Sequence, residues 1–227
     1  MRNASARWAV FTRVVMPPFT ATAVILKMNE DATVIANLSL TEIGQGTGTA
    51  VRQIIAEELR FPPERIKIAV EKDTDHDPYD WQTVASKGLL LSGNAAILAA
   101  EDLLKSAYET ETQALRAQPC DLGHDADKVF LRHHPAKFVS FASMAVGLAL
   151  PNGNGIGGPL VGVGRYIAQG LSFLDKETGE GTPALDWTYG AHGLVVEVQP
   201  VTGEYRVLKI ASVYDVGRAI NPEIVRG

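Results

Sequence analysis

The most constraining feature of the sequence is a glycine-rich loop that joins a strand-like run to a helical pattern. Residues 33–40 read as a strand, and the chain then continues Thr41-Glu42-Ile43-Gly44-Gln45-Gly46-Thr47-Gly48-Thr49. Apolar residues follow at helical spacing, namely Val51, Ile54, Ile55 and Leu59. A loop that enters a helix in this way presents free backbone N–H groups and the positive end of the helix dipole. The loop is therefore a candidate site for an anionic ligand.

A second polar loop opens onto a second helix further along the chain. It reads Gln82-Thr83-Val84-Ala85-Ser86-Lys87-Gly88, and Ser86 is a favourable residue for capping a helix N-terminus. A long helix is predicted behind it from one apolar face, formed by Leu90, Ile97, Ala100, Leu104 and Tyr108. Two such helix ends close together would suit a ligand with two or more phosphates.

The glycine spacing matches neither of the two common phosphate-binding patterns. No Lys-Ser or Lys-Thr pair follows the glycines, as a P-loop requires, and Thr49 stands where a Rossmann fingerprint has its third glycine. A Rossmann-type nucleotide-binding module stays open as an alternative, and it predicts a first strand within a parallel sheet. A non-catalytic assembly domain, in which the glycine loops are subunit contacts, is the other alternative.

Composition excludes several classes of function. The chain has 227 residues with 46% hydrophobic and 21% charged side chains, which suits one large or two small globular domains. A net charge of −5 with dispersed Lys and Arg argues against nucleic acid as a partner. Cys120 is the only cysteine, so a disulfide or a multi-cysteine iron–sulfur site within the chain is excluded. No apolar run is long enough for a membrane span and no signal peptide is recognised, so a cytoplasmic protein is expected.

One acidic segment invites a metal hypothesis, which its spacing does not support. Residues 73–80 read Asp-Thr-Asp-His-Asp-Pro-Tyr-Asp, similar to the start of an EF-hand loop. Pro78, however, takes the position of the invariant glycine, and Val84 takes that of the bidentate glutamate. We therefore expect a solvated turn and no metal ligand.

The remaining patterns predict one supersecondary unit that occurs twice. Residues 23–28 and 33–40 form a predicted β-hairpin, which leads into the glycine loop and its helix, and residues 66–70 alternate as a strand. Leu194–Val198 and Tyr205–Val213 predict a second hairpin, followed by a polar turn and a helix that Asn221 caps. The second unit stops at Gly227, barely one turn into that helix, so we expect the natural chain to continue.

We place a boundary where the pattern breaks after the long helix. The break predicts a first β-β-α-β-α unit over residues 1–118. Residues 119–227 are expected to hold linker strands, a helix from Ser140 to Ala149 and the start of the second unit.

Three segments in a fixed order resemble a known family. TEIGQGTGTAVRQIIAEEL, DTDHDPYDWQTVASKG and SGNAAILAAEDLL are similar to the large, molybdopterin-binding subunit of the xanthine dehydrogenase and aldehyde oxidase family of molybdenum hydroxylases. The C-terminal stretch with Asp-Val-Gly-Arg-Ala-Ile-Asn-Pro resembles a later hairpin and signature of the same subunits. The resemblance covers most of the chain and is weakest in the middle.

The resemblance implies a fold, a cofactor and partners. The fold would be a two-layer α+β arrangement with mixed sheets and repeated hairpin-helix-strand-helix units. The cofactor would be molybdopterin, or molybdopterin cytosine dinucleotide, with molybdenum in the full enzyme and none in this fragment alone. Partners would be the remaining halves of the large subunit, iron–sulfur and FAD subunits or domains, and a small-molecule substrate such as an aldehyde, a purine or an N-heterocycle.

The resemblance also assigns roles to single residues. The residues implied to contact the cofactor are Gly44, Gln45, Gly46, Thr47, Thr83, Ala85 and Ser86. Those implied to lie beside the substrate are Val14, Val84 and Ala85. The catalytic glutamate of the family lies in a later part of the subunit, so no catalytic residue is expected here and the isolated chain is expected to be inactive.

Overall fold

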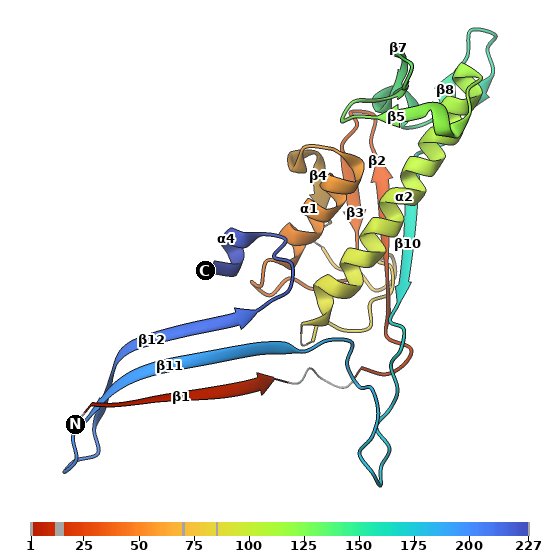
Figure 1. Ribbon diagram of the computed structural model, residues 1–227. Helices are drawn as coiled ribbons and strands as arrows, with labels where there is room; N and C mark the ends of the chain where they lie inside the picture. The colour runs from red at the N-terminus through yellow and green to blue at the C-terminus, as the bar shows by residue number, and fades with distance from the viewer. Residues whose placement is uncertain (1, 12–15, 70, 85, 227) are drawn as a thin grey trace. The chain divides into compact units, whose positions relative to one another are not determined.

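The computed structural model describes residues 2–11, 16–69, 71–84 and 86–226, without the side chains of residues 2–11 (Figure 1). Contacts between Cα atoms divide the chain into two compact units, Phe19–Gln169 and Met1–Pro18 with Gly170–Gly227. This division differs from the expected boundary after residue 118. Strand pairing between distant parts of the sequence is the reason, because each unit contains a sheet whose strands come from both sides of that boundary.

The larger unit is built on a four-stranded mixed sheet of order β10-β2-β3-β4. β2 (Ala21–Met28) pairs antiparallel with both β3 (Val34–Asn37) and β10 (Val161–Ile167), and β3 pairs parallel with β4 (Ile66–Ile68). The predicted hairpin and the strand after the first helix are confirmed, although the second hairpin strand ends at Asn37. The Rossmann alternative is wrong, because both neighbours of the first strand in this sheet run antiparallel to it.

Two helices form the second layer. α1 (Thr47–Leu59) and α2 (Lys87–Leu115) pack against each other, and both lie on one face of the sheet with their N-termini at the same end (Figure 1). Alternate residues of β2 point into the core, which suits a strand covered on one face. The main apolar residues of this core are Val24, Leu26, Met28, Val34, Val51, Ile55, Leu59, Ala95, Ala99 and Leu103.

The closest approach between the layers depends on glycines in β10. A Cβ atom added to Gly164 would stand 1.8 Å from the carbonyl oxygen of Ala95, and one added to Gly162 would stand 2.0 Å from that of Ala99. Both obstacles are helix backbone, which cannot rotate away as a side chain can. The two glycines, together with the alanines facing them, therefore let α2 lie directly on the strand.

Gly164→Ala is expected to destabilise the chain by about 1–3 kcal/mol, because α2 must move off the sheet to admit the methyl group. Urea unfolding followed by circular dichroism measures the change. Gly155→Ala is the matched control, since a Cβ there meets nothing within 4 Å. Equal stability of the two variants would show that α2 packs less closely on β10 than the structure indicates.

A smaller set of elements follows α2 in the same unit. β5 (Leu122–His124), β6 (Lys128–Leu131) and β7 (His134–Ser140) form an antiparallel sheet, and β8 (Leu148–Ala149) pairs with β9 (Gly155–Ile156). Two 3-10 turns, Pro63–Arg65 and Pro119–Asp121, each precede a strand. The helix expected from Ser140 to Ala149 is a single turn, α3 (Phe141–Met144), capped by Ser140. It stops early because Gly147 has a φ of 110° and the chain then enters β8.

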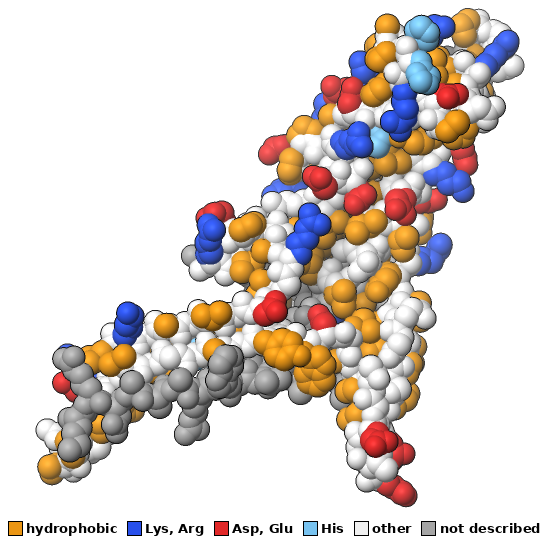
Figure 2. Space-filling view, viewed as in Figure 1, with side chains coloured by type: hydrophobic (Ala, Val, Ile, Leu, Met, Phe, Trp, Pro, Cys, Tyr) orange, Lys and Arg blue, Asp and Glu red, His pale blue; other side chains and the backbone are white. Residues whose placement is uncertain are grey.

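The smaller compact unit, Met1–Pro18 with Gly170–Gly227, contains the predicted later hairpin. β1 (Arg2–Phe11), β11 (Thr188–Val198) and β12 (Tyr205–Asp215) form an antiparallel sheet, and α4 (Pro222–Arg226) follows. Asn221 caps α4 as predicted, since its Oδ1 accepts a hydrogen bond from Ile224 N at 3.1 Å. Every residue of β12 is exposed, and its apolar side chains are visible in Figure 2.

The fold class is therefore α+β with several small mixed and antiparallel sheets, as the sequence predicted. Among the described residues, no helix has the length and apolar character that a membrane crossing requires.

Candidate functional site

The two polar loops singled out in the sequence meet at one end of the four-stranded sheet. The backbone N–H of Thr41 donates a hydrogen bond to Thr83 Oγ1 at 2.9 Å, which ties the glycine loop to the turn before α2. Leu40 packs on the first turn of α2, because a Cβ added to Gly88 would lie 2.8 Å from its Cδ1. The structure therefore brings together the segments in which we expected cofactor contacts.

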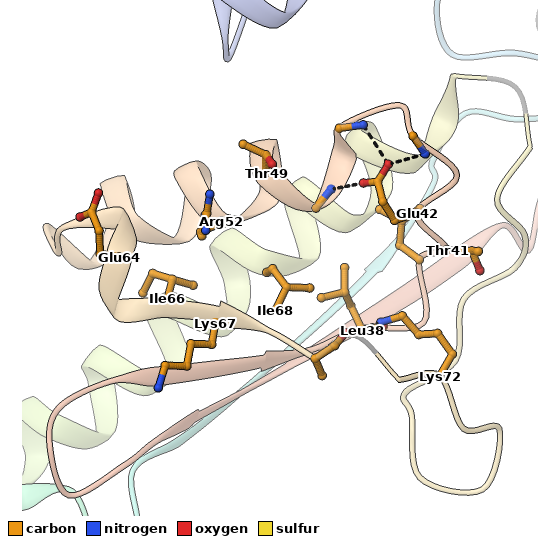
Figure 3. Close-up of a pocket in the computed structure, with 15 residues that line it drawn as sticks. Leu38, Thr41, Glu42, Thr49, Arg52, Glu64, Ile66, Lys67, Ile68 and Lys72 are labelled. Carbon is orange, nitrogen blue, oxygen red and sulfur yellow. Dashed lines mark hydrogen bonds between the residues drawn. The ribbon is translucent and has the colours of Figure 1, made fainter.

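The glycine loop folds around the carboxylate of Glu42 (Figure 3). Glu42 Oε1 accepts hydrogen bonds from the backbone N–H groups of Gly44 at 3.0 Å and Gly46 at 2.9 Å, and Oε2 accepts one from Gly48 at 2.9 Å. Gly44 has a φ of 99° and Gly46 a φ of 78°. Since L-residues rarely adopt these angles, the glycines are what allow the N–H groups to converge on one carboxylate.

Sequence reasoning missed this role of Glu42. We expected open N–H groups at the start of α1, whereas the chain supplies its own anion there. The hydrogen bond from the Gly48 amide does most to hold the pKa of Glu42 below its ordinary value. Burial opposes it, and the Gly46 and Gly44 amides add smaller contributions that lower the pKa. An acidic residue two positions before a run of alternating glycines was the available clue in the sequence.

Gln45 is exposed at the tip of the loop, and its side chain also binds its own backbone. Its Oε1 accepts a hydrogen bond from Ile43 N at 2.7 Å, and its Nε2 donates one to Thr41 O at 3.0 Å. An amide carries two N–H donors and two acceptor lone pairs. One donor and one acceptor of Gln45 thus stay available for a ligand.

The structure describes the turn before α2 except for Ala85. Thr83 and Val84 are half-buried, and Ser86 is exposed at the N-cap of α2 without a side-chain capping hydrogen bond. Ala85, expected beside both cofactor and substrate, and Val14, expected beside the substrate, lie outside the described residues. Gly46 and Thr47 lie at the start of α1, as expected.

A buried ion pair encloses this turn, and sequence reasoning missed it as well. Lys87 is the first residue of α2, and its Nζ lies 3.7 Å from Asp80 Oδ1, with side-chain exposures of 1% and 3%. Lys87 Nζ also lies 5.5 Å from the centre of the Trp81 ring. Burial lowers the pKa of Lys87, and the charge of Asp80 opposes that effect. Asp80 is anchored in turn by a β-bridge to Thr22 of β2.

A cavity of about 660 Å³ lies beside the glycine loop (Figure 3). Its apolar lining includes Leu38, Ile66 and Ile68, and its polar lining includes Glu42 and Arg52. The volume lies within the range of about 300–1,000 Å³ that is usual for small-molecule sites. The combination of an apolar wall, glycine backbone and a few polar groups suits a flat heterocycle better than a metal ion.

The acidic segment behaves as a turn. Asp73 Oδ2 lies 2.9 Å from His76 Nδ1, and hydrogen bonds from the Asp75 amide and from His76 lower the pKa of Asp73. Within the part of the chain that the structure describes, no group of three or more His, Cys, Asp or Glu side chains is placed to hold a metal ion.

Sequence comparisons identify the relatives of this chain. The chain is 34% identical over 203 residues to the probable hypoxanthine oxidase XdhD of Escherichia coli (strain K12), covering 89% of this chain and 19% of that protein. It is 27% identical over 202 residues to the carbon monoxide dehydrogenase large chain of Hydrogenophaga pseudoflava, covering 89% and 23%. The chain thus spans about a fifth of the length of these curated relatives.

The fold is shared with solved molybdenum enzymes. The structure superposes on a Cu,Mo-CO dehydrogenase with a TM-score of 0.75 at 24% identity, over 99% of this chain and 28% of the other. For the aldehyde oxidoreductase of Desulfovibrio desulfuricans, the TM-score is 0.74 at 22% identity, over 99% and 21%. The family model for the molybdopterin cofactor-binding domain matches residues 6–227, and the chain therefore belongs to the family of molybdopterin cofactor-binding domains.

Proposed function

We propose that this chain forms part of the cofactor site of a molybdenum hydroxylase that oxidises an aldehyde, a purine or an N-heterocycle. The observation that supports it best is the hydrogen bond between Thr41 and Thr83, which joins the glycine loop to the turn before α2. In this proposal Gly44, Gln45, Gly46 and Thr47 contact the cofactor from one loop, and Thr83, Ala85 and Ser86 contact it from the other.

The described residues fit a molybdopterin ligand. The pterin ring is flat and has an edge of alternating donors and acceptors, which the free donor and acceptor of Gln45 and the Thr83 hydroxyl match. Gly44 and Gly46 have no side chains to block the approach of that edge. When bound, the cofactor supplies the two-electron redox chemistry of molybdenum. This chain orients the cofactor, and Val84 with Ala85 and Val14 would border the substrate.

The rest of the catalytic machinery belongs to other parts of the protein or its complex. We propose that the remaining halves of the large subunit complete the site and that iron–sulfur and FAD partners accept the electrons. A relative, the 6-hydroxypseudooxynicotine dehydrogenase complex subunit gamma of Paenarthrobacter nicotinovorans, is named as a subunit of a complex, which supports this proposal. The dinucleotide form of the cofactor and a cytoplasmic location stay predictions from the sequence.

Gln45→Ala, made in the intact enzyme, is expected to lower molybdenum content or turnover about ten-fold or more. The reason is that cofactor groups lose their partner, at roughly 1–3 kcal/mol for each unpaired group. Metal analysis and steady-state rates on one preparation measure both quantities.

Gln169→Ala is the matched control, because Gln169 is an exposed glutamine outside both loops whose Nε2 also bonds nearby backbone, at 3.3 Å to Ile167 O. If Gln45→Ala lowers only the melting temperature and leaves molybdenum content and rate per cofactor unchanged, Gln45 merely ties down its own loop. Unchanged content together with unchanged turnover would remove Gln45 from the site.

A further inference from the structure

The carboxylate of Glu42 is held by backbone amides of its own loop. Three N–H groups, from Gly44, Gly46 and Gly48, donate to it at 2.9–3.0 Å. Among the described residues Glu42 takes part in no ion pair, so these amides are its main stabilising partners. Gly48 lies in the first turn of α1, where the N–H groups have no partner within the helix.

The same segment also fixes Gln45. The Gln45 side chain closes back onto Thr41 and Ile43, the two neighbours of Glu42 in the sequence. Thr41 in turn donates its N–H to Thr83 of the second loop. Glu42 and Gln45 thus both hold the glycine loop through hydrogen bonds to its backbone.

We propose that Glu42 is a positioning residue, whose carboxylate holds the glycine loop in the conformation that binds the ligand. The same carboxylate keeps external phosphate away from the N-terminus of α1. A helix N-terminus attracts one anion, and here the chain occupies that position itself. A further negative group brought to the same amides would meet both an occupied donor set and a like charge.

This inference adds detail to the proposed function. It rests on that function for the identity of the ligand. The part of the cofactor that meets Gly44, Gln45 and Gly46 is then an uncharged hydrogen-bonding edge. Its phosphate groups bind elsewhere. The sequence analysis treated the N-termini of α1 and α2 as two candidate sites for the phosphates of one ligand. In this proposal the N-terminus of α1 binds none of them.

The test is hydrogen exchange of individual amides in this 227-residue chain at pH 7, read by NMR. In Glu42→Ala, the amides of Gly44, Gly46 and Gly48 are expected to exchange about ten-fold faster or more than in the wild type, while α2 amides keep their protection. Glu64→Ala is the matched control, because Glu64 is an exposed acid that lines the same cavity and makes none of these hydrogen bonds. Equal exchange in the wild type and Glu42→Ala would overturn the proposal.

Inorganic phosphate provides a readout that a purely structural role would not change. At constant ionic strength, phosphate is expected to slow exchange of the Gly46 and Gly48 amides in Glu42→Ala and to leave them unchanged in the wild type and in Glu64→Ala. If phosphate slows amide exchange in the wild type, the Glu42 carboxylate does not exclude anions. If phosphate does not slow amide exchange in Glu42→Ala, the carboxylate does not occupy an anion-binding position.

The pH dependence gives an independent check with a defined sign. The pKa of Glu42 is lowered in the folded chain, so its hydrogen bonds persist as pH falls and are lost only below the ordinary value of 4.5. The NMR chemical shifts of the Gly44, Gly46 and Gly48 amides are expected to change together, with a midpoint below pH 4.5. In Glu42→Gln this step is expected to be absent. A common step that survives in Glu42→Gln would contradict the assignment. No cofactor is present in these experiments, so they succeed or fail independently of the Gln45 test.

Discussion

Lys87→Met is expected to destabilise the chain by about 3–5 kcal/mol, because it leaves the carboxylate of Asp80 buried without its counter-charge. Methionine keeps most of the length and apolar volume of lysine, so the substitution removes the charge without opening a large cavity. The Asp80 side chain is 3% exposed and its Oδ1 has no hydrogen-bond partner among the described residues. Urea unfolding at pH 7 measures the loss, and most of it reflects the unpaired acid rather than the net strength of the pair.

Two further variants give this prediction its controls. Lys87→Met combined with Asp80→Asn is expected to recover most of the lost stability, since neither charge then stays buried alone. Arg206→Met breaks a shorter pair, 3.0 Å to Glu197, but these side chains are 74% and 54% exposed. An exposed pair contributes about 0–1 kcal/mol. A loss in Lys87→Met no larger than in Arg206→Met would mean that water reaches Asp80.

The position of this ion pair links stability to the candidate site. Asp80 precedes the turn that contains Thr83 and Ser86, and Lys87 follows it, so the pair holds the two ends of that turn together. Asp80 is itself bridged to β2, which is part of the central sheet. We therefore expect the turn to be positioned by the core of the unit. Substitutions at either end of the pair should also loosen the cofactor contacts proposed for the turn.

The sequence predicted those parts of the fold that depend on local pattern. The first hairpin, α1 and α2 each have a clear period of apolar residues and a turn or glycine boundary, so they were located closely. The partners of the strands were not predictable in the same way. β10 follows α2 by many residues and joins β2 through contacts that no local pattern encodes. For that reason the observed units do not follow the expected boundary after residue 118.

The sequence identified the two loops of the candidate site but did not indicate the electrostatics within them. Glycine spacing and the turn before α2 identified the two loops, and the hydrogen bond from Thr41 to Thr83 shows that they meet. The role of Glu42 depends on where its carboxylate points, and that depends on the positive φ angles of Gly44 and Gly46. The burial of Lys87 is likewise a result of tertiary packing, since a lysine in the first turn of a helix is ordinarily exposed.

A buried acid near the C-terminal end of α2 gives a second large effect, and this one depends on pH. Glu111 of α2 is fully buried, and neither carboxylate oxygen has a hydrogen-bond partner among the described residues. Burial raises the pKa of Glu111 to about 7, with a smaller opposing effect from the nearby Val139 backbone. The folded chain therefore holds a proton that the unfolded chain releases near its ordinary pKa of 4.5.

The sign of the pH dependence follows from this difference in proton binding. Below pH 4.5 both states are protonated at Glu111, so its contribution to stability is fully present. Between pH 4.5 and about 7 the folded state binds more protons than the unfolded state, and the free energy of unfolding falls as pH rises. Above about pH 7 Glu111 is ionised in both states, and its burial then lowers the free energy of unfolding by its full amount. From the size of the pKa shift, this penalty is about 3 kcal/mol.

Glu111→Gln is expected to remove this penalty, because the amide has nearly the same shape and cannot ionise. At pH 8.5 the variant should be about 3 kcal/mol more stable to urea than the wild type, whereas below pH 4.5 the two should be similar. Glu109→Gln, at an exposed position of the same helix, should leave the pH profile unchanged. If Glu111→Gln is no more stable than the wild type at pH 8.5, the carboxylate of Glu111 has a partner in solution that compensates for its burial.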